Sequence, residues 1–253
     1  MRLPIYWNSD RGFAIEKPSG IQVLPDNWYP QTPVLTEALN FQAETEKGEL
    51  LRLGLDTSGA KAIFQCEADL AGMALFAKDS DTADFWSNAY GSYEFELKVH
   101  FLVVRAPTEL ESCECDLPLA RHGEENEMLV SHRTGKKTQT QFKRLQSRGR
   151  YSIWEATASY IRLHQIQLHA YEMGLSIVGE HQYARESEIY FSTLKRSFVP
   201  KGNEPERPIH AGPAMFLAEL TVPMPDGQKV TIQRPAPKHF SVLLKTLAKY
   251  GRG

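Results

Sequence analysis

The chain has 253 residues, of which 42% are hydrophobic and 24% charged, and its formal net charge is −2. These values are typical of a folded globular protein with its own core, and they exclude an intrinsically disordered chain. No apolar run reaches the length of a membrane span, and residues 1–10 are too polar for a signal peptide, so we expect no membrane association. The cysteines Cys66, Cys113 and Cys115 cannot form a disulfide framework, which favours reduced thiols in a cytoplasmic protein.

The hydrophobic pattern predicts more strands than helices. In the first half of the chain we expect strands over residues 5–6, 13–16, 21–24, 72–77 and 94–104, and helices over 34–43 and 80–90. In the second half we expect strands over 138–145, 152–156, 214–222 and 229–233, helices over 164–173 and 240–250, and a surface loop over 200–208. The mixed order indicates an α+β domain built on an extended sheet.

The segment between Glu127 and Glu155 contains no acidic residue. Its basic residues are Arg133, Lys136, Lys137, Lys143, Arg144, Arg148 and Arg150. Such a cluster can hold an RNA backbone through phosphate contacts and counterion release. It is equally typical of a solvated hairpin whose edge is protected by lysines. The segment alone does not decide between these two interpretations.

The standard motifs of other site classes are missing from the sequence. There is no Gly-rich phosphate loop followed by Lys-Ser/Thr and no dinucleotide fingerprint. His164 and His169 are five residues apart, on different faces of a helix, and Cys113 and Cys115 supply only two thiols where zinc requires about four ligands. We therefore expect neither a metal nor a cofactor.

Three segments of the sequence, 13–23, 135–142 and 164–183, together resemble motifs of the RluA/RsuA-type pseudouridine synthase family. Residues 13–23 (FAIEKPSGIQV) resemble the family's opening strand, which runs into Asn-Lys-Pro-x-Gly. Residues 164–183 resemble its His-Gln-Ile-Arg-Val-His helix and the Gly-x-Pro-Ile-x-Gly-Asp loop that follows, and residues 135–142 resemble its Gly-Lys-x-Ala-x-Thr strand. The motifs are weak singly, but their order covers nearly the whole chain. The resemblance implies the pseudouridine synthase fold, with an extended mixed or antiparallel sheet flanked by helices and a cleft at its centre.

The resemblance also implies a chemistry that uses no metal and no cofactor. The family detaches uracil from its ribose and rejoins it through carbon, with an Asp acting at the sugar, an Arg paired with that Asp, and a Tyr against the base. The target nucleotide is flipped out of the RNA stack. A desolvated carboxylate stays ionised only beside a cation, so the Asp and the Arg work as a pair.

All three site positions carry other residues in this chain. The Arg position falls on Gln167 and the Tyr position on His100. The Asp position falls on Gly54 if residues 52–59 are matched by their letters, or on Glu67 if the loop runs directly into the strand 72–77. We prefer Glu67, because residues 72–104 then align without gaps. Neither register supplies an Asp, and loss of a buried carboxylate is consistent with loss of its cationic partner.

These replacements lead to two main hypotheses. The first is an RNA-binding member of the family, with impaired or absent catalysis, that holds structured ribosomal or transfer RNA. The second is an active isomerase that uses Glu67, whose extra methylene displaces the carboxylate by about an ångström and can cost about a hundredfold in rate. A different reaction with Glu67, His100 or His164 as acid or base has no positive evidence. We expect RNA contacts from Lys136, Lys137, Lys143, Arg144 and His164, in a monomer with a single domain over residues 1–253 and no separate N-terminal RNA-binding domain.

Overall fold

The computed structural model describes residues 3–26, 30–45, 54–65, 67–123, 127–195, 197–198 and 205–251, without the side chain of Arg148. The chain divides into two compact units, each made of separate stretches. The first unit comprises Met1–Lys98, Ser159–Leu163 and Leu217–Arg234, and the second comprises Val99–Ala158, His164–Phe216 and Pro235–Gly253. Strands β5 (Glu96–Arg105) and β12 (Met215–Pro223) have residues in both units. The single domain over residues 1–253 stays a prediction.

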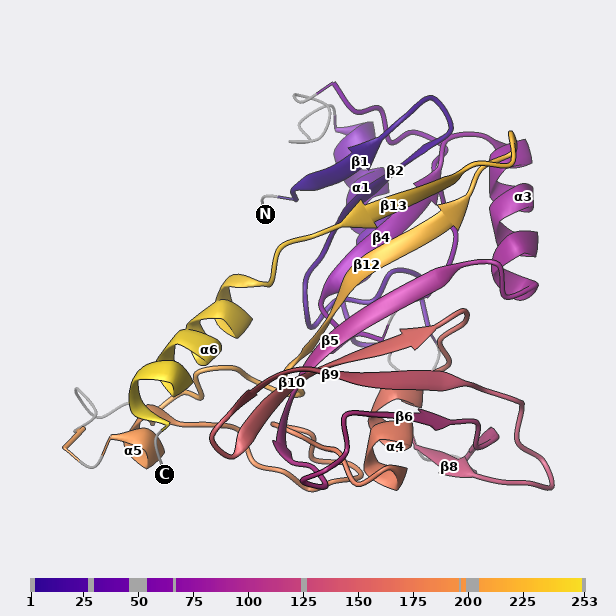
Figure 1. The fold of residues 1–253 in the computed structure, drawn as a ribbon. Coiled ribbons are helices and arrows are strands. Elements are labelled where there is room, and N and C mark those ends of the chain that lie inside the picture. Colours follow the sequence, from indigo (N-terminus) through magenta and orange to yellow (C-terminus); the bar gives the residue numbers. More distant parts are fainter. Residues whose placement is uncertain are drawn as a thin grey trace. The chain divides into compact units, whose positions relative to one another are not determined.

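The first unit is built on an antiparallel sheet with the strand order β1-β2-β4-β3 (Figure 1). Its strands are β1 (Ile5–Asn8), β2 (Gly12–Lys17), β3 (Lys61–Ala62) and β4 (Gly72–Ala77). Every residue of β4 is buried, which explains why its sequence is continuously apolar rather than alternating. The unit also contains helix α1 (Leu35–Glu44), the residues of β12 after Phe216, and β13 (Lys229–Gln233), which pairs antiparallel with β12.

Helix α3 (Ser80–Gly91) covers the first sheet through a fully buried tryptophan. The helix begins after Asp79, whose carboxylate accepts a hydrogen bond from the Thr82 backbone N–H at 2.8 Å. Trp86 is 0% exposed and donates its indole N–H to the Pro223 carbonyl oxygen at 2.8 Å. A Cβ added at Gly12 would lie 2.6 Å from the Trp86 ring, so the close approach of sheet and helix requires glycine there.

The second unit is built on strands in the order β5-β10-β9-β6, with β11 (Ser176–Ile177) antiparallel to β5. Strands β9 (Thr140–Arg148) and β10 (Tyr151–Ala158) form a hairpin, and β6 (Ser112–Cys115) pairs antiparallel with β9. A smaller hairpin joins β7 (Leu119–Arg121) to β8 (Met128–Val130). The helices described in this unit are α4 (Gln165–Glu172), α5 (Phe191–Leu194) and α6 (Lys238–Tyr250).

The α+β class with antiparallel sheets is confirmed, and the strand expected at 72–77 has the same bounds in the structure. The strand expected at 21–24 is wrong, since only Gln22 forms an isolated bridge, with Val34. The backbone N–H groups of Val23 and Leu24 instead donate to the Gln65 side-chain oxygen, at 3.1 and 2.9 Å, so they are not available to a sheet. The short strands β6, β7, β8 and β11 were not predicted. Much of the loop expected at 200–208 lies outside the described residues.

None of the described helices combines the length and apolarity needed to cross a lipid bilayer. Cys113 and Cys115 on β6 are free thiols, and burial raises the pKa of both. Cys66 lies outside the described residues. The structure places no group of three or more His, Cys, Asp or Glu side chains around a metal position in the part of the chain that it describes.

Candidate active site and RNA interface

The loop that carries Glu67 is fastened to the Lys-Pro motif of the first unit. Lys17 is 0% exposed, and its ammonium group donates to the carbonyl oxygens of Leu70 at 2.7 Å and Ala68 at 3.0 Å. The backbone N–H of Gly20 also donates to the Ala68 oxygen, at 2.8 Å. Hydrogen bonds to a charged donor are stronger than neutral ones, so this lysine fixes the course of the loop just before β4. Two segments that the family resemblance singled out separately are thus in direct contact.

Glu67, the carboxylate of the preferred register, lies in the loop that enters β4, and its catalytic role stays a prediction. Glu67 lies five residues before Gly72, where β4 begins, and its carbonyl accepts from the Leu70 N–H at 3.2 Å. Gly54 instead occupies a turn with a φ of +78°, and Arg52, needed for the other register, lies outside the described residues. Glu67 belongs to the first unit, and Gln167 and His100 belong to the second. Their meeting in one pocket stays a prediction.

Helix α4 begins at the residues that the family resemblance assigns to catalysis and RNA contact. His164 precedes the helix with a left-handed backbone, φ 52°, and every residue from Gln165 to Ala170 is buried. Gln167, at the position of the family's Arg, is 5% exposed. A neutral amide therefore stands on a buried helix face where a guanidinium would need a counter-charge.

His164 is oriented by Tyr183, which follows the loop after β11. The Tyr183 hydroxyl lies 2.9 Å from His164 Nδ1 and accepts the Met128 backbone N–H at 3.0 Å. The carboxylate of Glu180, 3% exposed, accepts the backbone N–H groups of Gln182, Tyr183 and Ala184 at 2.8, 2.9 and 2.6 Å. Glu180 takes the place of the Asp in the family's Gly-Asp loop, and it shapes the turn that presents Tyr183 to His164.

His169 lies one helical turn further along α4 and ties the helix to β9. It is 0% exposed, and its Nε2 donates to the Leu117 carbonyl oxygen at 2.9 Å, while Nδ1 lies 2.9 Å from the Thr140 hydroxyl. Gln165 donates to the same Thr140 hydroxyl at 3.0 Å. Burial lowers the pKa of His169 from its ordinary value of 6.5, so the ring is held neutral and has a structural role.

The stability of the second unit is therefore expected to depend on pH. The folded pKa of His169 is below the unfolded value, so unfolding takes up a proton once the pH falls below about 6.5, and stability decreases from there downward. Burial lowers the pKa of His210 in the same direction. Thermal unfolding followed from about pH 7.5 to 5 should show a smaller decrease for His169→Gln than for the unchanged chain. Equal decreases in the two proteins would contradict this assignment.

His100, at the position of the family's Tyr, is hydrogen-bonded across two strands of the second unit. Its Nε2 lies 3.0 Å from a carboxylate oxygen of Glu155 on β10, and the two side chains are 30% and 19% exposed. The ring also meets Phe216 edge-on, with centroids 5.6 Å apart. The Glu155 carboxylate orients the imidazole, so the ring is not free to turn as an unrestrained side chain is.

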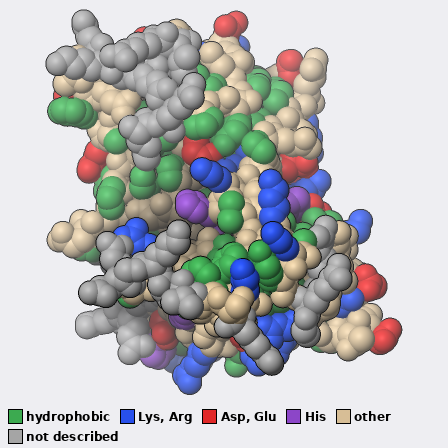
Figure 2. Space-filling view, turned by 90° about the vertical axis from the view of Figure 1, so that its left-hand side faces the viewer, with side chains coloured by type: hydrophobic (Ala, Val, Ile, Leu, Met, Phe, Trp, Pro, Cys, Tyr) green, Lys and Arg blue, Asp and Glu red, His purple; other side chains and the backbone are tan. Residues whose placement is uncertain are grey.

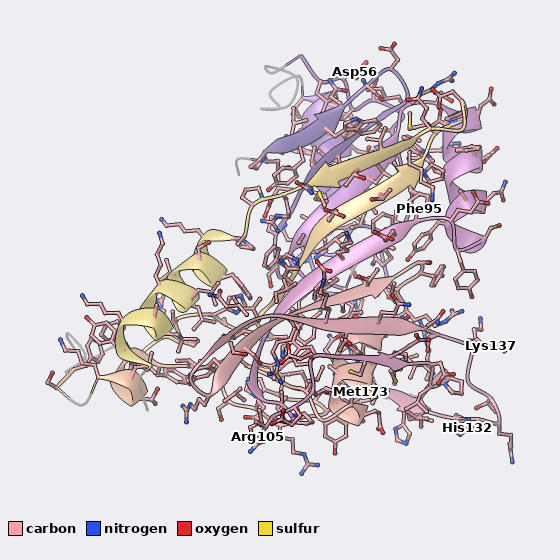
Figure 3. All side chains as sticks on the ribbon, in the orientation of Figure 1. Asp56, Phe95, Arg105, His132, Lys137 and Met173 are labelled. Carbon is pink, nitrogen blue, oxygen red and sulfur yellow. The ribbon has the colours of Figure 1, made fainter. Side chains whose placement is uncertain are left out.

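The loop between β8 and β9 is a rigid turn that exposes two lysines. The Gly135 N–H donates to the Ser131 carbonyl oxygen at 2.8 Å, and a Cβ at Gly135 would lie 2.3 Å from that oxygen. Lys136 is then held by two backbone hydrogen bonds with Leu119, at 2.9 and 3.0 Å. Lys137 is labelled on this loop in Figure 3. Lys136, Lys137 and, on β9, Lys143 are all exposed, so their ammonium groups are accessible to a phosphate backbone.

Arg144 is placed differently from its lysine neighbours. Its side chain is 13% exposed, and its guanidinium donates to the carbonyl oxygens of Pro107 and Thr108 and to the Glu111 carboxylate at 2.9 to 3.3 Å. The guanidinium also lies 5.2 Å from the Trp154 ring centroid. These contacts fasten β9 to the loop before β6, and an RNA contact of Arg144 stays a prediction.

Helix α6 carries basic side chains that the sequence analysis did not single out. Lys238, Lys245 and Lys249 are exposed on it, whereas Phe240 and Leu243 are buried. No acidic residue follows Asp226 in the sequence. This absence of acidic residues could have identified α6 as a basic surface from the sequence alone. Figure 2 shows the molecule from the side of α6, with Lys and Arg side chains in blue.

Comparisons with known proteins agree with the fold and the motifs. No family model matches the chain. The "uncharacterized RNA pseudouridine synthase slr1629" of Synechocystis sp. is 24% identical over 253 residues, covering 96% of this chain and 68% of that protein. The "ribosomal large subunit pseudouridine synthase D" of Nitrosomonas europaea is 22% identical over 245 residues, covering 97% and 65%. The solved structure of human RNA pseudouridylate synthase domain containing 4 has a TM-score of 0.70 at 16% identity, covering 96% and 92%.

The fold is thus that of a pseudouridine synthase. Over nearly its whole length the chain is similar to proteins named as RNA pseudouridine synthases, in agreement with the resemblance that the three motifs carry.

Proposed function

We propose that this protein is an RNA-binding member of the RluA-type family whose isomerase activity is impaired or lost. The observation that carries the proposal is Gln167, a neutral side chain 5% exposed on α4 at the position of the family's arginine. Without a guanidinium, the site lacks the cation with which the family's reaction pairs its carboxylate. Glu67 and His100 replace the other two groups of the family's site, and they support the same conclusion.

The RNA contact is proposed from the exposed lysines on rigid elements of the second unit. Lys136 and Lys137 lie on a turn held by backbone hydrogen bonds, and Lys143 lies on β9. Such positions contact phosphates at little entropic cost, because the backbone is already ordered before RNA binds. The named relatives act on RNA, and one is named for the large ribosomal subunit. We propose structured ribosomal or transfer RNA as the partner.

An active isomerase is the second candidate, and the anchoring of the Glu67 loop favours it. Lys17 holds this loop at the Ala68 and Leu70 carbonyl oxygens, so a carboxylate is still presented from an ordered backbone. In that case the longer side chain of Glu67 would act in place of the Asp, at a reduced rate.

The experiment incubates the protein with transcribed ribosomal and transfer RNA and maps pseudouridine by carbodiimide-induced stops. We expect RNA retained at low salt and released as salt rises, with no new stop at any uridine. Stops that appear with the unchanged protein and disappear with Glu67→Ala would establish the active enzyme instead. Failure to retain either RNA at low salt would reject both candidates.

A further inference from the structure

Helix α3 ends in a tight hydrogen-bonded turn with a tyrosine where glycine is usual. The Tyr93 N–H donates to the Tyr90 carbonyl oxygen at 3.1 Å, and the Glu94 N–H donates to the Ala89 carbonyl oxygen at 3.0 Å. This pair of bonds defines a Schellman motif, whose left-handed position is occupied here by Tyr93, with φ 63°. A bulky L residue is strained in this conformation, whereas glycine is not. Residues with backbone strain of this kind cluster at active sites and ligand-binding sites.

The Tyr93 side chain is largely in solvent and lies beside a second tyrosine. It is 52% exposed, and its ring centroid is 5.7 Å from that of Tyr160, at an angle of 48°. The Arg162 guanidinium lies over the Tyr160 ring, 4.9 Å from the centroid. Two rings and a guanidinium thus form one half-exposed group in the first unit.

The group formed by Tyr93, Tyr160 and Arg162 packs against buried aromatic side chains. Tyr160 stacks on Tyr90 with centroids 4.4 Å apart, and Tyr90 stacks on Phe64 at 5.2 Å. The Tyr90 hydroxyl exchanges hydrogen bonds with the backbone N–H and carbonyl of Ile161, at 3.2 and 3.3 Å. Phe95, labelled in Figure 3, meets the Tyr90 ring edge-on at 5.4 Å. The exposed rings are therefore held in place by the core rather than by their own flexible side chains.

The buried end of the stack leads into the loop of the candidate site. Phe64 is 4% exposed and lies three residues before Glu67, in the segment that runs into β4. A ligand that contacts Tyr93 would thus be connected, through the packed rings between Tyr93 and Phe64, to the loop that carries the Glu67 carboxylate. Phe41 on α1, although 66% exposed, makes no described ring contact, so an exposed aromatic side chain does not by itself create such a group.

We propose that Tyr93, with Tyr160 and Arg162, is a stacking platform for an unpaired base of the bound RNA. Aromatic rings and guanidinium planes are the groups on which proteins stack splayed bases, and every base offers a π face to them. The positive charge of Arg162 adds attraction for the flanking phosphates. The platform extends the proposed RNA binding and depends on it. It assigns the first unit a base contact, distinct from the phosphate contacts of the lysines in the second unit.

The test compares two synthetic RNAs, a stem-loop with an unpaired uridine-containing loop and a blunt duplex of the same stem. Tyr93→Gly removes the ring and also relieves the backbone strain, so the variant should melt at or above the temperature of the unchanged protein. We expect its affinity for the stem-loop to fall about fivefold or more, and its affinity for the duplex to stay the same. Tyr93→Phe keeps the ring and should bind both RNAs normally, as should the control Phe41→Ala.

The ratio of stem-loop to duplex affinity is independent of the fraction of folded protein, so a fall in stability cannot mimic the result. An unchanged ratio in Tyr93→Gly would overturn the platform, and so would an equal change in Phe41→Ala. Failure of the unchanged protein to bind either RNA would reject the proposed RNA binding itself. The two failures are therefore distinguishable.

Discussion

Replacing Lys136, Lys137 and Lys143 together with glutamine should lower the affinity for RNA about tenfold or more at physiological salt. Each exposed ammonium that neutralises a phosphate releases about one counterion, so the slope of log affinity against log salt should decrease by about two to three. The fold should be unaffected, because these side chains are exposed and make no described hydrogen bond or ion pair. Filter binding across a salt series measures both quantities.

A matched control removes the same charge from the first unit. Arg11, Lys61 and Lys229 are all exposed, and their replacement by glutamine changes the net charge equally. We expect this control to lower the affinity much less, through the long-range field alone. Equal losses in both triple variants would mean that the β8–β9 loop and β9 have no special place in RNA binding.

The largest expected effect on folding comes from Gly179→Ala, in the loop between β11 and Glu180. Gly179 has a φ of +73°, and a Cβ there would lie 2.2 Å from the Gly212 carbonyl oxygen. The segments around Gly179 and Gly212 are joined by a hydrogen bond from the Ala214 N–H to the Val178 carbonyl oxygen, at 2.8 Å. Neither backbone can therefore move away from the added Cβ without breaking this hydrogen bond. We expect a cost above about 4 kcal/mol, enough to lower the melting temperature by roughly 10 °C or to prevent soluble expression.

Gly227→Ala separates the clash from the backbone conformation. Gly227, in the β12–β13 turn, has a φ of +83°, but nothing lies within 4 Å of an added Cβ. Its replacement should cost only about 1 to 2 kcal/mol, the penalty of a left-handed alanine. Differential scanning calorimetry of the two variants gives the comparison. A similar loss of unfolding free energy in both variants would show that the backbone around Gly179 shifts to make room for the added Cβ.

Local patterns in the sequence predicted most of the regular elements. The apolar strand expected at 72–77, the helix expected at 164–173 and the strands expected at 138–145 and 152–156 all agree with elements of the structure. These features depend on periodicity and turn chemistry within one segment, which is why the amino-acid order specifies them directly.

The chemical roles of individual side chains could not be predicted in this way. Arg144 and its lysine neighbours are alike in the sequence. In the structure, however, the Arg144 guanidinium donates hydrogen bonds to the Pro107 and Thr108 carbonyl oxygens, whereas the lysines are exposed. The sequence indicated no metal role for His169 and predicted no other role, and only its burial against Leu117 and Thr140 explains the neutral ring. Each role depends on groups between 29 and 52 residues away, whose contacts no local pattern contains.

The sequence by itself predicted the α+β class and the resemblance to pseudouridine synthases, because both follow from residue identity and order. Only the tertiary structure decided that Lys17 fastens the Glu67 loop, that His100 pairs with Glu155, and that Tyr93 is exposed in a strained turn. Hydrogen bonds, ion pairs and desolvation act between atoms that folding brings within a few ångströms. Their strength therefore depends on distances in space, which spacing along the chain does not fix.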